Sequence, residues 1–230
     1  MSQFKDTSKC VVVNNGIDTE EFNPSIVSKD LREEFKIPND KIIIGTAGRV
    51  VPRKNFEHFV KLGIDICKKH KKNCLFVLVG DTPYYFGQSL MPKLKNMVKE
   101  AGLEDKFLFT GYTDCVEKYI SDFDIFFIPS KYEDPFPRVV IESMALGKPV
   151  LGYNIGGIGE AIDNKINGYS FKTDDTSVID SILELIEDEE LRLKMSFEAR
   201  KKAVNFYDSR IIASKILDNI GLLFSGGSKS

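Results

Sequence analysis

The segment KIIIGTAGRVVPRKN, residues 41–55, decides the fold class of this chain. It begins with a nearly continuous apolar run, passes through Gly45 and Gly48, and leads into an amphipathic stretch over residues 55–70. A buried strand, a glycine turn and a helix in this order are typical of a βαβ unit whose parallel sheet is covered on both faces. The turn lies where such sheets bind ligands, at the carboxyl end of a strand.

The same alternation of apolar runs and amphipathic stretches continues through the rest of the chain. The apolar runs predict strands over residues 10–13, 41–47, 74–79, 106–110, 124–129 and 149–153, with a short edge strand over 168–171. Helical periodicity predicts helices over residues 26–35, 55–70, 90–101, 116–121, 138–146, 158–162, 176–186, 189–205 and 209–223. We therefore predict an α/β fold: a single Rossmann-like, doubly wound, mostly parallel sheet with helices on both faces and a helical C-terminal tail.

The chain shows no internal repeat and no linker long enough to separate two domains, so we expect one domain. Its expected parts are an N-terminal tail over residues 1–8, the α/β domain over 9–205, a C-terminal helix over 206–225 and a disordered tail over 226–230.

Composition excludes several classes of protein. The chain has 230 residues, 42% of them hydrophobic, which is enough for a core without disulfides or metals. Lys+Arg number 32 and Asp+Glu 34, so the net charge of -2 gives no overall attraction for nucleic acid, and we expect no nucleic-acid partner. No run of 18 apolar residues and no signal-peptide core is present, which predicts a cytoplasmic protein. We interpret the cysteines as reduced core thiols: Cys10, Cys67, Cys74 and Cys115.

A first group of candidate binding residues surrounds the turn after residues 41–47. Gly48 allows the backbone to approach a ligand, and Arg49, Arg53 and Lys54 place positive charge at the start of the next helix. Cations oppose the helix dipole there, whereas an anion such as a phosphate is held by the dipole, the free amides and a bidentate guanidinium together. The alternative is a solvated basic turn. A nicotinamide-type site is a poor match because no G-x-G-x-x-G follows a strand.

A second group lies in EDPFPRVVIESMALGKPV, residues 133–150. Pro137 is suited to the first position of a helix, and the amides of residues 138–140 then point out of the sheet's ligand edge. Glu142 falls on a helix that is apolar on nearly every side, so its carboxylate needs a partner, and a ribose with two vicinal hydroxyls is one. The alternative is an ion pair with Arg138, four residues earlier.

The two groups together resemble a known family. GTAGR with Lys54 five residues after the arginine, followed by DPFPRVVIE and SMALGKPV, resembles the C-terminal, donor-binding domain of retaining glycosyltransferases of family 4, in glycosyltransferase group 1, which have the GT-B fold. The opening VVVNNGIDTEEFNP also resembles the start of that domain. The resemblance runs from about residue 9 to about residue 205.

The resemblance implies roles for individual residues. Arg49 and Lys54 correspond to the pair that contacts the donor diphosphate, and Glu142 to the residue that holds the ribose. The remaining implied donor contacts are Asp134 and the backbone of Phe136, Pro137, Arg138 and Val139 at the sugar and diphosphate, Gly111 and Tyr112 at the base, and Gly48, Gly80 and Asp81 along the crevice. Asp134, Arg49 and Lys54 are the implied catalytic residues.

The sequence departs from the family pattern at two positions. Asp134 stands where Glu is usual, and Pro137 where Gly is common, so Glu133 is an alternative sugar contact although its spacing to Glu142 is one residue too long.

The implied activity is that of a hexosyltransferase in polysaccharide or glycolipid synthesis. It moves a hexosyl group from a nucleoside-diphosphate sugar to a hydroxyl of a glycan or lipid-linked acceptor, with retention and without a metal or other cofactor. Most of the family's acceptor contacts lie in an N-terminal domain that this chain lacks, so we expect poor activity from the chain alone. A helix crossing to that domain would carry the stripe Ile211, Ile212, Ile216, Ile220 and Leu223, whose exposure predicts self-association. The complete enzyme is expected to be cytoplasmic or peripheral at the inner membrane face.

Three other functions use the same sequence features. The first is a regulatory module that binds sugar nucleotides without catalysing a reaction, and the second is an epimerase that acts on the sugar of the nucleotide sugar. The third is a flavodoxin-like interaction domain that binds no nucleotide. Smaller features remain open. Gly156 and Gly157 are interpreted as a turn and His58 as a surface or core-edge residue, while the aromatic segment over residues 84–87 either contacts an acceptor or covers the core.

Overall fold

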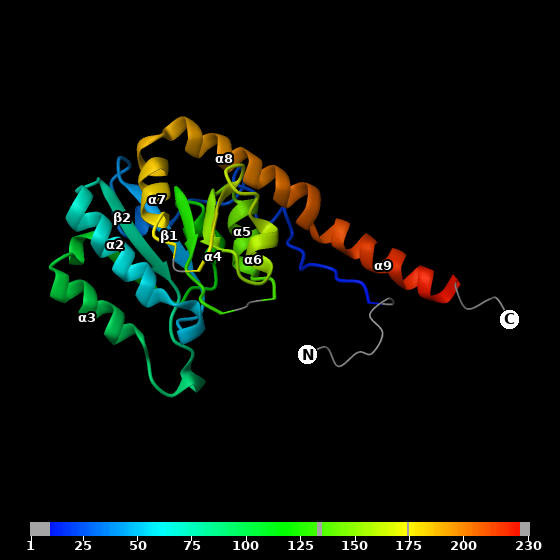
Figure 1. Cartoon of the computed structure of the whole chain (residues 1–230), viewed down its shortest axis with the longest axis horizontal. Helices are drawn as coiled ribbons and strands as arrows, with labels where there is room; N and C mark the ends of the chain where they lie inside the picture. Colours follow the sequence, from blue (N-terminus) through cyan, green and yellow to red (C-terminus); the bar gives the residue numbers. More distant parts are fainter. Residues whose placement is uncertain (1–9, 133–134, 174, 226–230) are drawn as a thin grey trace.

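A computed structural model describes residues 10–132, 135–173 and 175–225, with side chains described as far as residue 220. A six-stranded sheet with the order β3-β2-β1-β4-β5-β6 forms its centre, and every pairing is parallel (Figure 1). The strands are β1 Ile42–Ala47, β2 Cys74–Val79, β3 Phe107–Gly111, β4 Ile125–Ile128, β5 Val150–Tyr153 and β6 Gly168–Phe171. The doubly wound α/β fold expected from the sequence is confirmed.

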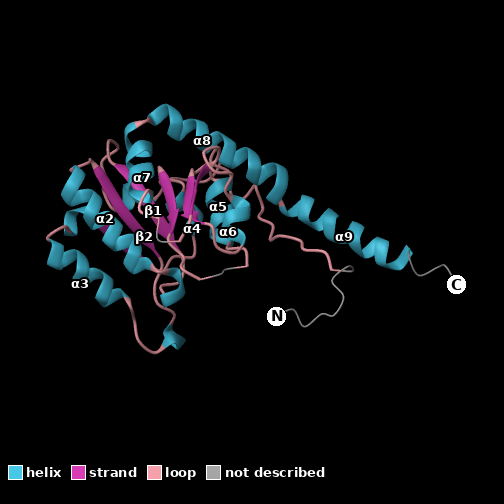
Figure 2. Ribbon diagram, viewed as in Figure 1, coloured by secondary structure: helices cyan, strands magenta, loops and turns pink. Residues whose placement is uncertain are grey.

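Helices cover both faces of this sheet (Figure 2). The helices are α1 Leu31–Glu34, α2 Phe56–His70, α3 Met91–Ala101, α4 Val116–Ile120, α5 Arg138–Ala145, α6 Gly157–Ala161, α7 Val178–Glu187, α8 Glu189–Lys202 and α9 Ser209–Ser225. Short turns of other helix types occur at η1 Pro52–Lys54, η2 Tyr84–Phe86, η3 Glu104–Lys106 and η4 Ala203–Tyr207.

The core is two apolar layers, one on each face of the sheet. Side chains of α2, α3 and α7 pack on one face, and those of α4, α5 and α6 on the other. Because both faces are covered, all residues of β2, β4 and β5 are buried, as their continuous apolar sequences predict.

The strand predicted over residues 10–13 is wrong. The segment is irregular, and Val11 and Val12 are 61% and 87% exposed. Their β-branched side chains favour an extended backbone, but a strand also needs a neighbour, and this segment pairs with neither edge strand of the sheet. The expectation of four core thiols also fails in part, because Cys67 and Cys74 are buried whereas Cys10 and Cys115 are exposed.

The chain enters and leaves the domain at one place. Ile17 forms an isolated parallel bridge with Asp208, the Ile17 amide donates to the Tyr207 carbonyl at 2.8 Å, and the Ser209 amide donates to the Ile17 carbonyl at 2.9 Å. The buried Asp208 carboxylate accepts from Arg210 and Thr19, and these partners hold its pKa well below the usual range. Beyond this junction α9 extends away from the sheet (Figure 1).

Within the described part of the chain, none of the helices combines the length and apolarity needed to span a bilayer. The expected tails over residues 1–8 and 226–230 lie outside the described residues.

Candidate functional site

Three neighbouring strands end in glycines with positive φ. Gly48 follows β1 with φ 143°, Gly80 follows β2 with φ 129°, and Gly111 ends β3 with φ 78°. The Gly48 amide donates to the Val79 carbonyl at 2.9 Å, and the Gly80 amide donates to the Gly111 carbonyl at 2.8 Å. The carboxyl ends of β1, β2 and β3 are therefore fixed to one another by their backbones.

Gly80 is required at its position by sterics as well as by its backbone angle. A Cβ at Gly80 would lie 2.0 Å from the carbonyl oxygen of Gly48, far inside van der Waals contact. The close approach of these two turns leaves a floor made of backbone, on which a ligand can lie without meeting side chains.

A pocket of about 240 Å³ opens at these strand ends. Its walls come from the ends of β1, β2 and β3 and from α4 and α5, and its lining is Ala47, Gly48, Arg49, Val79, Gly80, Asp81, Tyr112, Thr113, Val116, Val139 and Glu142. We call this the strand-end pocket. It joins residues from both sequence groups, 45–55 and 133–150, as the argument from parallel strands requires.

Glu142 supplies a carboxylate to the strand-end pocket. Its side chain is 13% exposed, and its Oε1 lies 3.6 Å from Nε of Arg138, whose side chain is 64% exposed. Burial raises the pKa of Glu142, and the nearby Arg138 guanidinium offsets only part of this effect. The ion pair considered as an alternative is therefore present, but it does not fully compensate the buried carboxylate.

Arg49 brings a guanidinium to the same pocket. The residue is exposed, and its guanidinium donates a hydrogen bond to the Tyr85 hydroxyl at 3.0 Å. Arg49 and Glu142 thus place a cation and a carboxylate on the walls of one hollow.

The residues just before α5 are held by packing and do not border the strand-end pocket. Pro137, the N-cap, is extended, and its side chain cannot accept a hydrogen bond from the first-turn amides. Phe136 is buried, its ring lies 5.2 Å from the ring of Tyr207, and its carbonyl accepts from the Asn15 side chain at 2.9 Å. Phe136 and Pro137 therefore anchor the beginning of the helix and do not line the strand-end pocket.

Lys54 is placed outside the pocket lining. It ends η1, is 8% exposed, and precedes Asn55, whose left-handed backbone turns the chain into α2. The Lys131 amide donates to the Arg53 carbonyl at 3.2 Å, which ties η1 to the segment after β4. Asp134 and Glu133 lie outside the described residues, so their expected roles stay predictions.

The pocket also contains residues that the sequence did not single out. Thr113 and Val116 follow Tyr112 after β3, and Ala47 and Val79 end β1 and β2. Only their position could have indicated them, because residues that closely follow the carboxyl end of a parallel strand are candidates for ligand binding. Gly111 was expected to border the nucleobase. It does not line the pocket, and its carbonyl accepts the hydrogen bond from the Gly80 amide.

The smaller features also receive a structural explanation. Gly156 is the N-cap of α6 with φ 53°, and a Cβ on Gly157 would lie 2.3 Å from the Pro135 carbonyl oxygen. These glycines therefore form the turn that was expected and also let the segment before α5 pack closely. His58 is half-buried and shares a hydrogen bond of 2.5 Å with the Tyr153 hydroxyl.

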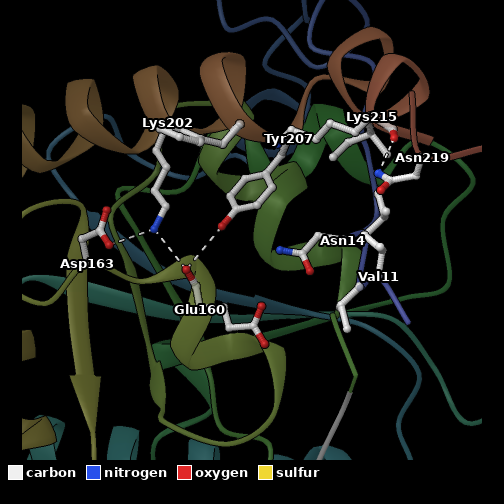
Figure 3. Close-up of a pocket in the computed structure, with 12 residues that line it drawn as sticks. Val11, Asn14, Glu160, Asp163, Lys202, Tyr207, Lys215 and Asn219 are labelled. Carbon is white, nitrogen blue, oxygen red and sulfur yellow. Dashed lines mark hydrogen bonds and ion pairs between the residues drawn. The ribbon is translucent and has the colours of Figure 1, made fainter. Parts of the chain in front are cut away.

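A larger hollow of about 500 Å³ lies between the amino-terminal segment, α6, α8 and α9 (Figure 3). We call it the terminal groove. Lys202 donates to Asp163 at 2.9 Å and to the Glu160 carbonyl at 3.1 Å, and the Tyr207 hydroxyl donates to the same carbonyl at 3.3 Å. Lys202, Asp163 and the Tyr207 hydroxyl are thus hydrogen-bonded within the groove itself.

Residues 27–202 match the family described as "Glycosyl transferases group 1". Among curated proteins, the chain is 28% identical over 219 residues to UDP-Gal:alpha-D-GlcNAc-diphosphoundecaprenol alpha-1,3-galactosyltransferase of Escherichia coli, covering 94% of this chain and 54% of that protein. The chain therefore spans about half the length of this relative.

Solved structures share the fold. An Anabaena protein, HepE, in complex with UDP and glucose has a TM-score of 0.80 at 23% identity, covering 92% of this chain and 56% of that one. The C-terminal domain of a glycosyl transferase group 1 family protein from Francisella tularensis has a TM-score of 0.73 at 25% identity, covering 84% of this chain and 100% of that one. The sheet and helices of this chain are accordingly those of one half of a GT-B structure.

Proposed function

This chain belongs to the glycosyl transferases group 1 family, and from that premise we propose that its strand-end pocket binds a nucleoside-diphosphate sugar as the donor half of a glycosyltransferase. The observation that carries the proposal is the meeting of Arg49, Glu142 and the glycine floor in one hollow. HepE, the structural neighbour with UDP and glucose bound, supports a nucleotide in a fold of this kind.

Each wall of the pocket has a proposed role. Tyr112 and Thr113 border the base, and Glu142 accepts hydrogen bonds from the two ribose hydroxyls, which compensates its buried charge. Arg49 and the amides of Arg138 and Val139 at the start of α5 hold the diphosphate, while the Val140 amide donates to the Pro137 carbonyl at 3.1 Å. Gly48 and Gly80 give the diphosphate room against the backbone.

The proposed reaction is hexosyl transfer with retention, as in family 4. The bond between the anomeric carbon and the diphosphate oxygen breaks, a bond to the acceptor oxygen forms, and the nucleoside diphosphate and the acceptor's hydroxyl proton leave. Arg49, Lys54 and the α5 amides stabilise charge that develops on the diphosphate, and Asp134 faces the sugar. We propose that no metal takes part.

The acceptor is proposed to be a glycan or lipid-linked sugar, with the product a polysaccharide or glycolipid. The Escherichia coli relative named above acts on a sugar linked to diphosphoundecaprenol, which supports an acceptor of this class. The rest of the acceptor site is proposed to come from an N-terminal domain or partner chain, at a cytoplasmic or peripheral membrane location, so this chain alone turns over poorly.

A thermal-shift screen tests donor binding in the chain as it is. UDP-glucose, GDP-mannose and ADP-glucose are added to the wild type and to the Arg49→Ala and Glu142→Ala variants. A sugar nucleotide at 100 times its Kd stabilises the fold by about 2.7 kcal/mol, a Tm increase of roughly 5–10 °C. We expect this shift with one base, and a shift reduced to about half or less in both variants at the same ligand concentration.

Lys202→Ala, which changes a lysine of the terminal groove, is the matched control and keeps the shift. Binding equal in wild type and both pocket variants, or no shift with any sugar nucleotide, contradicts the proposal. Conversion of a bound donor sugar without acceptor would instead identify an epimerase.

A further inference from the structure

Three consecutive aromatic side chains stand exposed beside the strand-end pocket. Tyr84, Tyr85 and Phe86 form η2 in the connection between β2 and α3, and they are 98%, 63% and 41% exposed. In Figure 1 this connection projects beyond the body of the domain. The segment therefore does not cover the core, which was one of its two expected roles.

Hydrogen bonds hold this aromatic segment in a defined shape. The Leu90 amide donates to the Thr82 hydroxyl at 3.1 Å, and the Phe86 amide donates to the Pro83 carbonyl at 2.9 Å. The rings of Tyr84 and Tyr85 meet edge to face, with centroids 5.6 Å apart. Exposed apolar surface that folding does not use, held in place by its own backbone, is typical of a surface that binds a ligand.

Arg49 connects the aromatic segment to the strand-end pocket. Arg49 lines the pocket, and its guanidinium donates to the Tyr85 hydroxyl at 3.0 Å. The aromatic rings consequently begin one hydrogen bond away from the residue that is proposed to hold the donor diphosphate.

The charge of the segment limits what can bind there. Residues 81–92, DTPYYFGQSLMP, contain no lysine or arginine, and their one charged residue is Asp81. A segment that docks on anionic lipid would carry several cations of its own, whereas the cation that contacts Tyr85, Arg49, belongs to the strand-end pocket. A neutral pyranose fits better, because its C–H face packs on an aromatic ring while its hydroxyls reach the tyrosine hydroxyls and water.

We propose that Tyr84, Tyr85 and Phe86 form a subsite for a neutral pyranose ring of the acceptor, carried by the donor-binding half of the enzyme. The inference rests on the proposed function, since that function makes the neighbouring pocket a donor site. Tyr84 is the principal contact, because nearly all of its ring is available.

Saturation-transfer NMR with methyl α-D-glucopyranoside and its 2-acetamido analogue as probes tests the subsite. Titrations are made on wild type, Tyr84→Ala and Tyr84→Trp, with and without UDP. We expect saturation of the pyranose C–H protons in wild type, a Kd about 2- to 10-fold weaker in Tyr84→Ala, and recovery in Tyr84→Trp. Phe197→Ala, which removes a ring that is 67% exposed on α8, is the matched control and leaves the Kd unchanged.

Every other result overturns the inference in an identifiable way. No pyranoside binding, or the same Kd in wild type and Tyr84→Ala, removes the subsite. Sedimentation with phosphatidylglycerol vesicles that requires Tyr84, without pyranoside binding, assigns the segment to a membrane instead. Binding that depends on Tyr84 in a chain with no affinity for any nucleotide leaves a carbohydrate site but removes its acceptor role, and in that case the proposed function is what fails.

Discussion

The terminal groove and the strand-end pocket are hollows of very different character. The groove has about 500 Å³ and the pocket about 240 Å³, yet the groove's Lys202, Asp163 and Tyr207 hydrogen-bond within its own walls (Figure 3). The pocket instead holds Glu142. Burial raises the pKa of this carboxylate, and the ion pair with Arg138 offsets only part of that increase. Incompletely compensated charge at Glu142, and not volume, is therefore what singles out the proposed binding site.

The two hollows also differ in how their walls are made. The floor of the strand-end pocket is backbone at the ends of a fixed sheet, whereas the terminal groove lies between the amino-terminal segment, α6, α8 and α9, away from the strand ends. Changes to the pocket should thus affect both folding and binding, and changes to the groove should affect neither nucleotide affinity nor the sheet.

The largest effect is expected from Gly80→Ala. The new Cβ meets the Gly48 carbonyl oxygen at 2.0 Å and forces β1 and β2 apart, so we expect the free energy of unfolding to fall by at least about 3 kcal/mol and nucleotide binding to disappear. Gly102→Ala is the matched control, because Gly102 also has positive φ but open space around it, and we expect a loss of about 1 kcal/mol. Urea denaturation measures both, and equal losses would show that the close approach of the two turns is unimportant.

Arg49→Ala and Lys202→Ala compare one cation from each hollow. Loss of a charge-assisted contact to phosphate should weaken binding of the preferred sugar nucleotide by roughly 10- to 100-fold in Arg49→Ala. Lys202 is paired with Asp163 and the Glu160 carbonyl, so its removal should leave the affinity unchanged and cost a little stability. Isothermal titration calorimetry measures the nucleotide affinity of both variants. A larger loss of affinity in Lys202→Ala than in Arg49→Ala would assign the nucleotide site to the terminal groove.

Glu142→Gln is expected to give the smallest change in stability and affinity, and the pH dependence of both properties tests whether the charge of Glu142 is incompletely compensated. The folded-state pKa of Glu142 is raised, so its ionisation opposes folding, and that cost is absent below the unfolded-state pKa and complete above the folded-state pKa. The glutamine should therefore increase the free energy of unfolding by roughly 0.5 kcal/mol at pH 7 and have no such effect in acid.

The same variant should bind the nucleotide more weakly, by about 5-fold, because an amide offers the ribose one acceptor oxygen in place of two. In wild type, affinity should decline as pH falls toward the raised pKa of Glu142, and this decline should be absent from the variant. Denaturation and titration from pH 5 to pH 8 measure both properties. A variant that is less stable at neutral pH would show that Glu142 is a structural ion-pair partner of Arg138.

Much of the sheet could be predicted because its strands are covered on both faces and read as continuous apolar runs, as in β2 and β4. Residues 10–13 have the same composition, but a run of β-branched residues cannot indicate whether a neighbouring strand is available, and here none is. Local composition thus predicts extended backbone, while pairing depends on tertiary structure.

For the site, the sequence predicted which loops meet but not which way every side chain lies. Arg49 and Glu142 meet because parallel strands end at one edge and α5 presents Glu142 toward that edge. Lys54 and Phe136 lie outside the pocket lining because the left-handed turn at Asn55 and the packing of Phe136 on Tyr207 depend on contacts distant in sequence.

The junction of Ile17 with Asp208 has a consequence for how such a domain can be inherited. Because the chain comes in and goes out side by side, held by two backbone hydrogen bonds, the intervening fold can be cut out or spliced into another polypeptide without disturbing the sheet. Recombination can therefore join a unit with this geometry to a different companion domain while its strand-end pocket stays unchanged.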